Sequence, residues 1–279
     1  MRKVALAAVC LFGTSAGAWA NGACPAVTLS KLQSALKSAI AQTGGQLGLG
    51  LNMWATIVAA DGTVCSVANS SGEAIQGQWL ASRVISAQKA FTAATLSLGP
   101  TPNSGSGTGL ASGKLALSTA NLYSAVQPGG SLFGLATSNP VAVPEAYEGN
   151  GEVASSVTYG TNQDPMIGLI IGGINTFGGG LALYDTGGVK VGGVGVSGDT
   201  SCTDHLIAWH VRNNLGLDHL GTISGVSGDS QHPDNIVFDI TANPSGGTGS
   251  SLSGWGHPAC GSTNATATSI AKALPAVKN

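Results

Sequence analysis

The sequence predicts an α+β fold in which helices cover an antiparallel sheet. Three segments space their apolar residues as helices do, near residues 28–43, 78–98 and 201–215. Short β-rich runs are grouped between them and separated by turn residues. The predicted order is therefore helix, two strands, helix, insertion, three strands, helix. Because the strands follow one another in hairpins, we expect an antiparallel sheet and not alternating βαβ units.

The first half of the chain contains a helix, a hairpin and a second helix. Leucine and isoleucine recur every three or four residues from Thr28 or Ser30 to the breaker Gly44-Gly45. The run LGLGLNMWATIVAADGTVCSVANSSG then predicts two strands joined at Asp61-Gly62, a strong hairpin signal. Helical spacing returns in QWLASRVISAQKAFTAATLSL and ends at Gly99-Pro100.

The second half begins with irregular sequence, although SLFGLATSNPVAVP has apolar residues to bury. Short β-rich runs separated by glycine turns follow in MIGLIIGGINTFGGGLALYDTGGVKVGGVGVSG. A helix is expected from about Ser201 to Leu215, and NIVFDI (235–240) is the one strand-like piece after it.

The N-terminus predicts export. Arg2 and Lys3 precede an apolar run, and small residues end at Ala20, which is typical of a cleaved signal peptide over residues 1–20. We divide the remaining chain into a domain over 21–221, with polar insertions near 99–113 and 140–165, and a Gly/Ser-rich tail over 222–279 packed on that domain. The apolar run is too short for a membrane span, so we expect a periplasmic or secreted protein.

Four cysteines remain after the signal peptide, and an even set in an exported chain indicates two disulfides. Three pairings are possible. We favour Cys24–Cys65 and Cys202–Cys260, because each would tie a terminal segment to the nearest part of the core. A structural zinc site is the weaker alternative, since no two of these cysteines have C-x-x-C spacing.

Charge excludes some partner classes. Charged residues make up only 9% of the chain, the net charge is −2, and lysine and arginine form no cluster. Nucleic acids and anionic membrane surfaces are therefore poor partners.

The stretch GGVGVSGDTSCTDHLIAWH (192–210) contains G-x-G-x-x-G at Gly193, Gly195 and Gly198. A dinucleotide site needs those glycines to turn a strand directly into a helix within a βαβ unit. Here they lie in a strand that follows a predicted hairpin turn, and Asp199 stands where a phosphate would bind. We therefore expect the glycines to permit close packing or turning.

Two catalytic or metal readings apply to the same stretch. Ser197 resembles a nucleophile elbow, but the second glycine comes one residue early, which favours a strand-ending serine. His205 and His210 are five residues apart and point roughly 140° apart on a helix, so they cannot share one ion from one face. We keep both as metal candidates. His205 is otherwise expected to be a solvated surface residue, and His210 a hydrogen-bonded residue at the edge of the buried stripe.

Asp204 has a local interpretation. With Ser201 as N-cap, it would occupy the third helical position and bond back in a capping box, where its charge suits the helix N-terminus.

Four blocks of the chain occur in an order that resembles a known family. They are TIVAADGTVCSVANSSG, AQKAFTAAT, SLFGLATSNPVAVP and VGGVGVSGDTSCTDHLIA. This order is similar to that of the GlcG/HbpS-type haem-binding family, formerly a domain of unknown function. The resemblance covers about residues 28 to 217. The chain departs from the family in its cysteines, its longer polar insertions and its tail.

The resemblance implies a profilin-like α-β-α sandwich, a homo-oligomer, and binding of haem or a related tetrapyrrole such as a corrinoid. The residues that match the family's helix motif and closing motif are Lys89, Thr92, Gly195, Ser197, Gly198 and Asp204, and of these the resemblance implies binding roles for Lys89, Thr92, Ser197 and Asp204. Haem also needs an axial ligand and cations near its propionates. The candidates for these roles are His205, His210, Met166 and Tyr184 as iron ligands and Lys89 and Arg83 as propionate partners. We place His210 first among the iron ligands.

The sequence thus favours an exported, non-enzymatic tetrapyrrole carrier or sensor. One alternative is an enzyme acting on a small organic molecule in the same pocket, with Lys89 and Asp204 as acid and base. Another is a structural or interaction protein. The remaining histidines, His219, His232 and His257, are less informative, and those in the tail reach a shared site only if the tail folds back.

Overall fold

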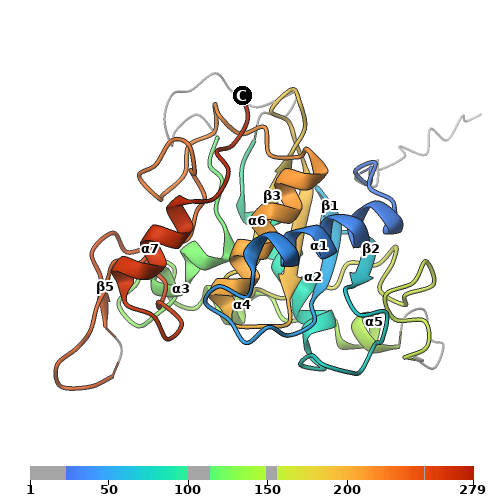
Figure 1. The fold of residues 1–279 in the computed structure, drawn as a ribbon, viewed down its shortest axis with the longest axis horizontal. Coiled ribbons are helices and arrows are strands. Elements are labelled where there is room, and N and C mark those ends of the chain that lie inside the picture. Colours follow the sequence, from blue (N-terminus) through green and yellow to red (C-terminus); the bar gives the residue numbers. More distant parts are fainter. Residues whose placement is uncertain (1–22, 100–113, 149–155, 248) are drawn as a thin grey trace, which may run out of the picture.

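A computed structural model describes residues 23–99, 114–148, 156–247 and 249–279 (Figure 1). A four-stranded antiparallel sheet of order β2-β1-β4-β3 forms the centre. Its strands are β1 (Trp54–Ala59), β2 (Val64–Asn69), β3 (Gly180–Tyr184) and β4 (Lys190–Ser197). The predicted α+β class is confirmed. The predicted signal peptide and nearly all of the insertion near 99–113 lie outside the described residues.

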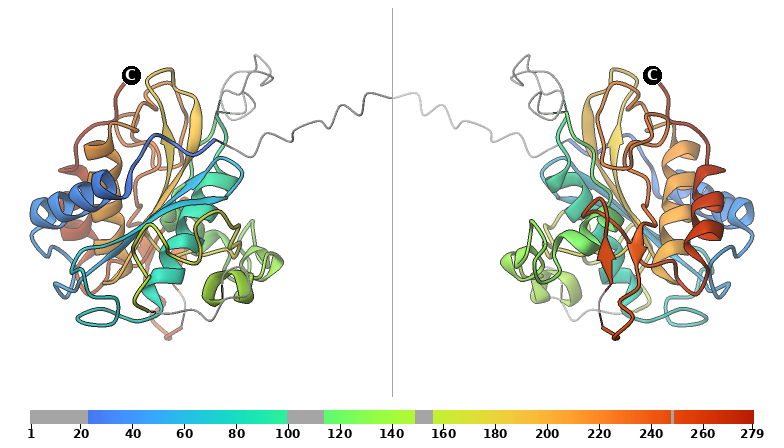
Figure 2. Two further views of the ribbon diagram at one scale, coloured as in Figure 1. Left: turned by 90° about the vertical axis from the view of Figure 1, so that its right-hand side faces the viewer. Right: turned by 90° about the vertical axis from the view of Figure 1, so that its left-hand side faces the viewer.

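Helices cover both faces of this sheet, which gives three layers (Figure 2). On one face α1 (Leu29–Thr43) packs against α6 (Ser201–Leu215). On the other face α2 (Ser82–Leu96) lies across β1, β3 and β4. The structure is therefore the predicted α-β-α sandwich.

Local signals explain α1 and the first hairpin. The Thr28 hydroxyl accepts a hydrogen bond from the Lys31 N–H at 3.2 Å and caps α1, while Gly44 ends it with φ +60°. Gly62 takes φ +91° in the turn between β1 and β2. Both predicted elements are confirmed at these positions.

Glycines let α2 approach the sheet closely. A Cβ on Gly195 would lie 1.9 Å from the Ser86 carbonyl oxygen, and one on Gly193 would lie 2.4 Å from that of Ala90. A Cβ on Gly180 of β3 would likewise lie 2.4 Å from the Lys89 carbonyl oxygen. The G-x-G part of the apparent dinucleotide motif therefore serves helix-to-sheet packing.

The second half has fewer strands than predicted. Of the three strands expected between the insertion and α6, only β3 and β4 form, and residues near 170 make isolated bridges such as Thr63 with Ile170. In NIVFDI only Ile240 joins a strand, β5 (Ile240–Thr241), which pairs with β6 (Ser250–Ser251). Asn235 instead donates its side-chain amide to the Ala271 carbonyl at 3.1 Å, so tertiary contacts override the local β preference there.

Short helices fill the segment between α2 and β3. They are η2 (Thr119–Asn121), α3 (Leu122–Ala125), α4 (Leu135–Ser138) and α5 (Val143–Tyr147). The apolar block SLFGLATSNPVAVP is largely exposed, with Phe133 67% accessible and no buried residue in α4, so the expected burial was wrong.

The C-terminal segment lies against the start of α6. Ala267 and Ala271 of α7 (Asn264–Lys272) pack in one cluster with Ile236 and Cys202. The structure forms both favoured disulfides, Cys24–Cys65 and Cys202–Cys260. The predicted pairing is confirmed.

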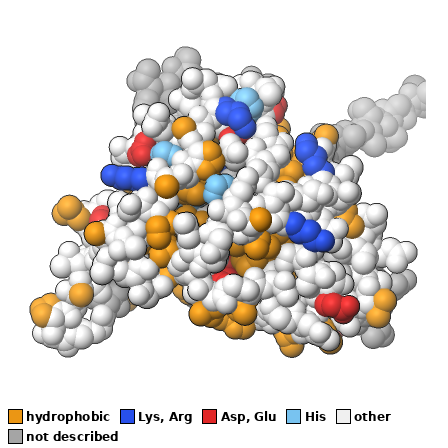
Figure 3. Space-filling model, viewed as in Figure 1, with side chains coloured by type: hydrophobic (Ala, Val, Ile, Leu, Met, Phe, Trp, Pro, Cys, Tyr) orange, Lys and Arg blue, Asp and Glu red, His pale blue; other side chains and the backbone are white. Residues whose placement is uncertain are grey.

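On the face drawn in Figure 3, charged side chains are scattered without forming a basic patch. Within the described ranges, no helix combines the length and the apolar character that crossing a membrane requires.

Candidate functional site

An open cleft of about 320 Å³ lies where α2 meets the start of α6. Its lining is more apolar than polar and includes the loop around Asn175 and Phe177. The lining residues are Trp79, Ser82, Ile85, Lys89, Asn175, Phe177, Ser197, Asp199, Thr200, Ser201 and Asp204. The helix block and the closing block of the family-like sequence therefore meet at one cleft.

A buried ion pair lies at this cleft. Lys89 Nζ is 2.6 Å from Asp204 Oδ2 and also donates to the Val196 carbonyl at 3.2 Å. The second oxygen of Asp204 accepts the Asp199 N–H at 3.0 Å. Each of the two paired residues is only 2% exposed. The pair therefore joins α2 to α6 across the end of β4.

Burial shifts the protonation of both partners. Removal from water raises the pKa of Asp204 to about 6, although the Lys89 ammonium opposes this rise. The same loss of hydration lowers the pKa of Lys89, and Asp204 opposes it. For both groups the cost of desolvation outweighs the mutual attraction, so burial favours the neutral form of each more than a surface ion pair would.

Two other residues fix the loops of the cleft. The Asp199 carboxylate accepts the N–H groups of Leu49 at 2.8 Å and Leu51 at 3.0 Å. Thr92 Oγ1 accepts the Asn175 N–H at 2.9 Å, which positions the loop that carries Phe177. These bonds hold both sides of the opening in place.

The cleft has aromatic walls that face water. Trp79 is 51% exposed and Phe177 is 50% exposed, and both line the opening. Leu49, held by Asp199, is 64% exposed nearby. Apolar exposure of this kind around a cleft is typical of a site that binds an apolar ligand.

The structure brings together some of the predicted site residues. Lys89, Ser197 and Asp204 line the cleft. Thr92 is not among the lining residues, but its hydroxyl accepts a hydrogen bond from the N–H of Asn175, which is one of them. Ser197 is the last residue of β4, as the strand-ending interpretation expected. Neither His205 nor His210 is among the lining residues.

Two local interpretations were wrong. His205 is fully buried rather than solvated, with Nε2 3.1 Å from Asn235 Oδ1, because the tail covers that side of α6. The N-cap of α6 is Thr200, whose hydroxyl accepts the Thr203 N–H, so Asp204 is the fourth helical residue and pairs with Lys89 instead of closing a capping box.

The other haem candidates are engaged elsewhere. Met166 is fully buried in the core cluster beside α2. The buried Tyr184 hydroxyl donates to the Leu98 carbonyl at 3.0 Å. Arg83 is paired with Asp164, whose Oδ2 accepts its Nε at 2.9 Å. His210 is half-buried, and burial lowers its pKa.

Sequence reasoning missed His257. The tail folds back and places its Nε2 3.1 Å from the Oγ of Ser201, a cleft residue. The adjacent disulfide partner Cys260 was the sequence signal for this proximity, because its predicted bond to Cys202 brings the tail to the start of α6.

The cleft suits a flat apolar ring better than it suits a haem iron. Trp79, Phe177 and Ile85 offer apolar surface, and Lys89 is a nearby cation. Among the described residues that line the cleft there is no histidine, methionine, tyrosine or cysteine, the side chains that ligate haem iron. The residues present therefore fit the macrocycle without supplying an axial ligand.

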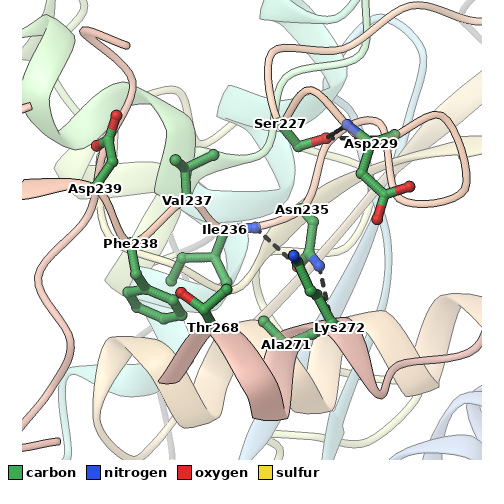
Figure 4. Close-up of a pocket in the computed structure, with 10 residues that line it drawn as sticks. All are labelled: Ser227, Asp229, Asn235, Ile236, Val237, Phe238, Asp239, Thr268, Ala271 and Lys272. Carbon is green, nitrogen blue, oxygen red and sulfur yellow. Dashed lines mark hydrogen bonds between the residues drawn. The ribbon is translucent and has the colours of Figure 1, made fainter. Parts of the chain in front are cut away.

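A smaller cavity of about 160 Å³ lies between the tail segment Ser227–Asp239 and α7 (Figure 4). Asn235, drawn at its centre, is already bonded to the Ala271 carbonyl. With half the volume of the cleft, it is a gap in the packing of the tail.

Comparison with known proteins gives structural neighbours. No family model matches the chain, and no curated protein matches it. The chain is similar to Klebsiella pneumoniae protein ORFY of family DUF336, with TM-score 0.39, 23% identity, and coverage of 67% of this chain and 89% of that one. It is similar to a PduOC:heme complex, with TM-score 0.39, 23% identity, and coverage of 68% and 95%.

A third neighbour is a double mutant of Streptomyces reticuli HbpS, with TM-score 0.36, 16% identity, and coverage of 76% and 99%. HbpS gives its name to the family that the four sequence blocks resemble. All three superpose only loosely on this chain.

Proposed function

We propose that this chain binds haem or a related tetrapyrrole, with the macrocycle held in the cleft between α2 and the start of α6. The observation that supports this proposal most directly is that Lys89 and Asp204, from two of the family-like blocks, meet at one cleft with aromatic walls. The ligand class comes from the resemblance of the sequence blocks. The exposed faces of Trp79 and Phe177 supply the stacking surface that a planar ring needs.

The structure favours binding through the ring. Because no cleft residue is of an iron-ligating type, metal-free protoporphyrin IX should bind about as tightly as hemin. Titration of the purified chain, followed by the Soret band and tryptophan quenching, measures both affinities. Trp79→Ala and Phe177→Ala should each weaken both ligands by about tenfold, the effect of losing roughly 1.4 kcal/mol of stacking and burial.

Phe133→Ala is the matched control, because Phe133 is an aromatic even more exposed than Trp79 and Phe177 that does not line the cleft. It should leave both affinities unchanged. If His210→Ala or His205→Ala abolishes the hemin band while protoporphyrin still binds, the iron is ligated at one of those histidines and the ring-only mode is wrong. Broad, unsaturable absorbance with both ligands would contradict tetrapyrrole binding altogether.

We also propose that the protein works outside the cytosol as a carrier or sensor and forms homo-oligomers. Two disulfides suit an oxidising compartment. Thiol labelling of protein taken from its own cells tests the compartment, since free thiols at Cys24, Cys65, Cys202 and Cys260 would contradict it. Light scattering during gel filtration measures the oligomer.

An enzyme is the second candidate. Lys89 and Asp204 are 2.6 Å apart at the cleft and have pKa values moved toward neutrality, an arrangement found in acid–base catalysts. A Lys89→Met variant that binds porphyrin normally but no longer converts a small organic substrate would favour this candidate over the carrier.

A further inference from the structure

Ser201 and His257 form a hydrogen-bonded pair at the edge of the cleft. Ser201 is the first residue of α6, partly exposed and part of the cleft lining. Its Oγ lies 3.1 Å from Nε2 of His257, which is 1% exposed. A serine open to ligand and a shielded imidazole behind it is the arrangement of an activated nucleophile.

The surroundings fix which nitrogen faces the serine. His257 Nδ1 lies 2.8 Å from the Pro258 carbonyl oxygen, an acceptor only, so Nδ1 carries the proton and donates it. Nε2 therefore presents its lone pair to Ser201, and the serine hydroxyl donates. The third group that orients the base is a backbone carbonyl.

Covalent and packing contacts hold the histidine in place. The Cys202–Cys260 disulfide joins the residue after Ser201 to the tail three residues beyond His257. The His257 N–H donates to the Val237 carbonyl at 2.8 Å, and the Tyr123 ring lies 5.2 Å from the imidazole. The dyad is thus built from α6 and the tail together.

We propose that Ser201 is an acyl-accepting nucleophile, with His257 as its general base, for esters that carry an apolar or aromatic group. The apolar group would occupy the cleft beside Phe177 and Trp79, which lie on the lining shared with Ser201. This inference is independent of tetrapyrrole binding, because it needs only the dyad and the apolar walls.

The chemistry balances with an ester and water. The Ser201 Oγ attacks the ester carbonyl carbon while its proton moves to His257 Nε2. Collapse of the tetrahedral intermediate breaks the bond to the leaving alcohol, which takes the proton from Nε2. Water then attacks the acyl-serine, gives one proton to Nε2, and releases the carboxylic acid as Ser201 regains its hydrogen.

The start of α6 can stabilise the oxyanion. The first N–H groups of a helix have no intrahelical acceptor. Thr200 uses its carbonyl and hydroxyl for the N–H groups of Asp204 and Thr203. The N–H groups of Ser201 and Cys202, the first two residues of α6, are therefore the candidates for this role, because the positive end of the helix dipole also lies there.

The imidazole is neutral at physiological pH. Burial lowers the pKa of His257 to about 4, and the nearby Lys89 charge adds to this. A neutral imidazole can accept the serine proton, but a low pKa makes it a weak base, and in the described part of the chain its ring contacts Ser201, Cys202 and the Pro258 carbonyl and no carboxylate. We therefore expect fast acylation by activated esters and slow release of the acyl group.

The experiment uses the oxidised, purified chain with p-nitrophenyl butyrate and a fluorophosphonate probe. We expect a burst approaching one p-nitrophenolate per chain and a probe adduct at Ser201, located by peptide mass spectrometry. Ser201→Ala should remove both. His257→Gln should slow labelling about 100-fold, the lower end of a general-base contribution. Ser38→Ala, an exposed serine on α1, is the matched control and should label normally.

Three results would overturn the inference: no adduct on folded wild-type protein, an adduct that persists in Ser201→Ala, or unchanged labelling in His257→Gln. Circular dichroism checks the fold of each variant. Ser201→Cys provides a second test, because a thiol at this position should react with iodoacetamide faster when His257 is present than in the His257→Gln background. Soret titration of His257→Gln separates this inference from the proposed function, since His257 does not line the cleft and porphyrin binding should survive there.

Discussion

At the residue scale, this chain places much of its small set of charges in its interior. Several cations are buried beside a carboxylate that lies far away in sequence, which satisfies charges that would otherwise be costly to bury. These pairs are Arg83 with Asp164, Lys89 with Asp204, and Arg212 with Asp234. The partner of Lys89 is 115 positions away. Helical spacing alone therefore could not decide whether Lys89 is solvated or buried.

The burial of His205 makes stability depend on pH. Desolvation lowers its pKa to about 3 in the folded chain, while in the unfolded chain the imidazole keeps its ordinary pKa of about 6.5. Between these values only the unfolded state binds the proton, so falling pH favours unfolding. From pH 7 to pH 5 this one residue should cost about 2 kcal/mol.

Urea unfolding of wild type and His205→Gln at both pH values measures this cost. Because other titrating groups are common to the two proteins, their difference isolates His205. The wild type should lose about 2 kcal/mol more than the variant between pH 7 and pH 5. Equal losses would mean that His205 is accessible to protons in the folded state.

At the element scale, the sequence predicted what local chemistry determines. α1 has its cap at Thr28 and its glycine stop at Gly44, and the hairpin turns at Gly62, all near the expected positions. The errors lie where distant segments decide the outcome. NIVFDI does not form a full strand, because the Asn235 side chain is hydrogen-bonded to the Ala271 carbonyl of α7. Asp204 does not close the expected capping box, because it is paired with Lys89. The sequence identified several residues of the cleft but not the cleft itself, because the walls come from segments that are far apart in the chain.

The glycines of β4 provide the prediction at this scale. In Gly195→Ala the new Cβ would meet the Ser86 carbonyl oxygen at 1.9 Å, so α2 must move off the sheet. Overpacking against backbone should cost about 1–3 kcal/mol or more and lower Tm by roughly 5 °C. Differential scanning calorimetry measures the change.

Gly187→Ala is the comparison within the same β-hairpin. A Cβ there would meet nothing closer than Asp185 Oδ1 at 3.3 Å, at the exposed turn between β3 and β4. Its Tm should stay within about 2 °C of wild type, because surface changes of this kind usually lie within ±0.5 kcal/mol. Similar Tm values for both variants would show that the helix does not rest on these glycines.

At the scale of the whole molecule, the sandwich is completed by segments outside its sheet. The tail shields His205, pairs Asp234 with Arg212 at 2.6 Å and brings His257 to the cleft. The composition predicted a tail packed on the domain, but it did not identify which tail residues contribute buried groups to α6. Contacts of this kind depend on tertiary placement, which composition does not encode.

The two disulfides should therefore have different consequences when removed. Each closes a long loop, of 41 residues for Cys24–Cys65 and 58 for Cys202–Cys260, so the loop-closure model gives about 4 kcal/mol of stability for either one. The Cys24→Ser/Cys65→Ser variant should lose that stability in urea while its tail stays protected. Cys202→Ser/Cys260→Ser should lose as much and should also be cut by protease within 222–279, because the buried contacts of His257 and Asp234 then depend on packing alone. Limited proteolysis with mass spectrometry distinguishes the two, and equal tail protection in both variants would mean that packing, without the covalent link, is enough to hold the tail on α6.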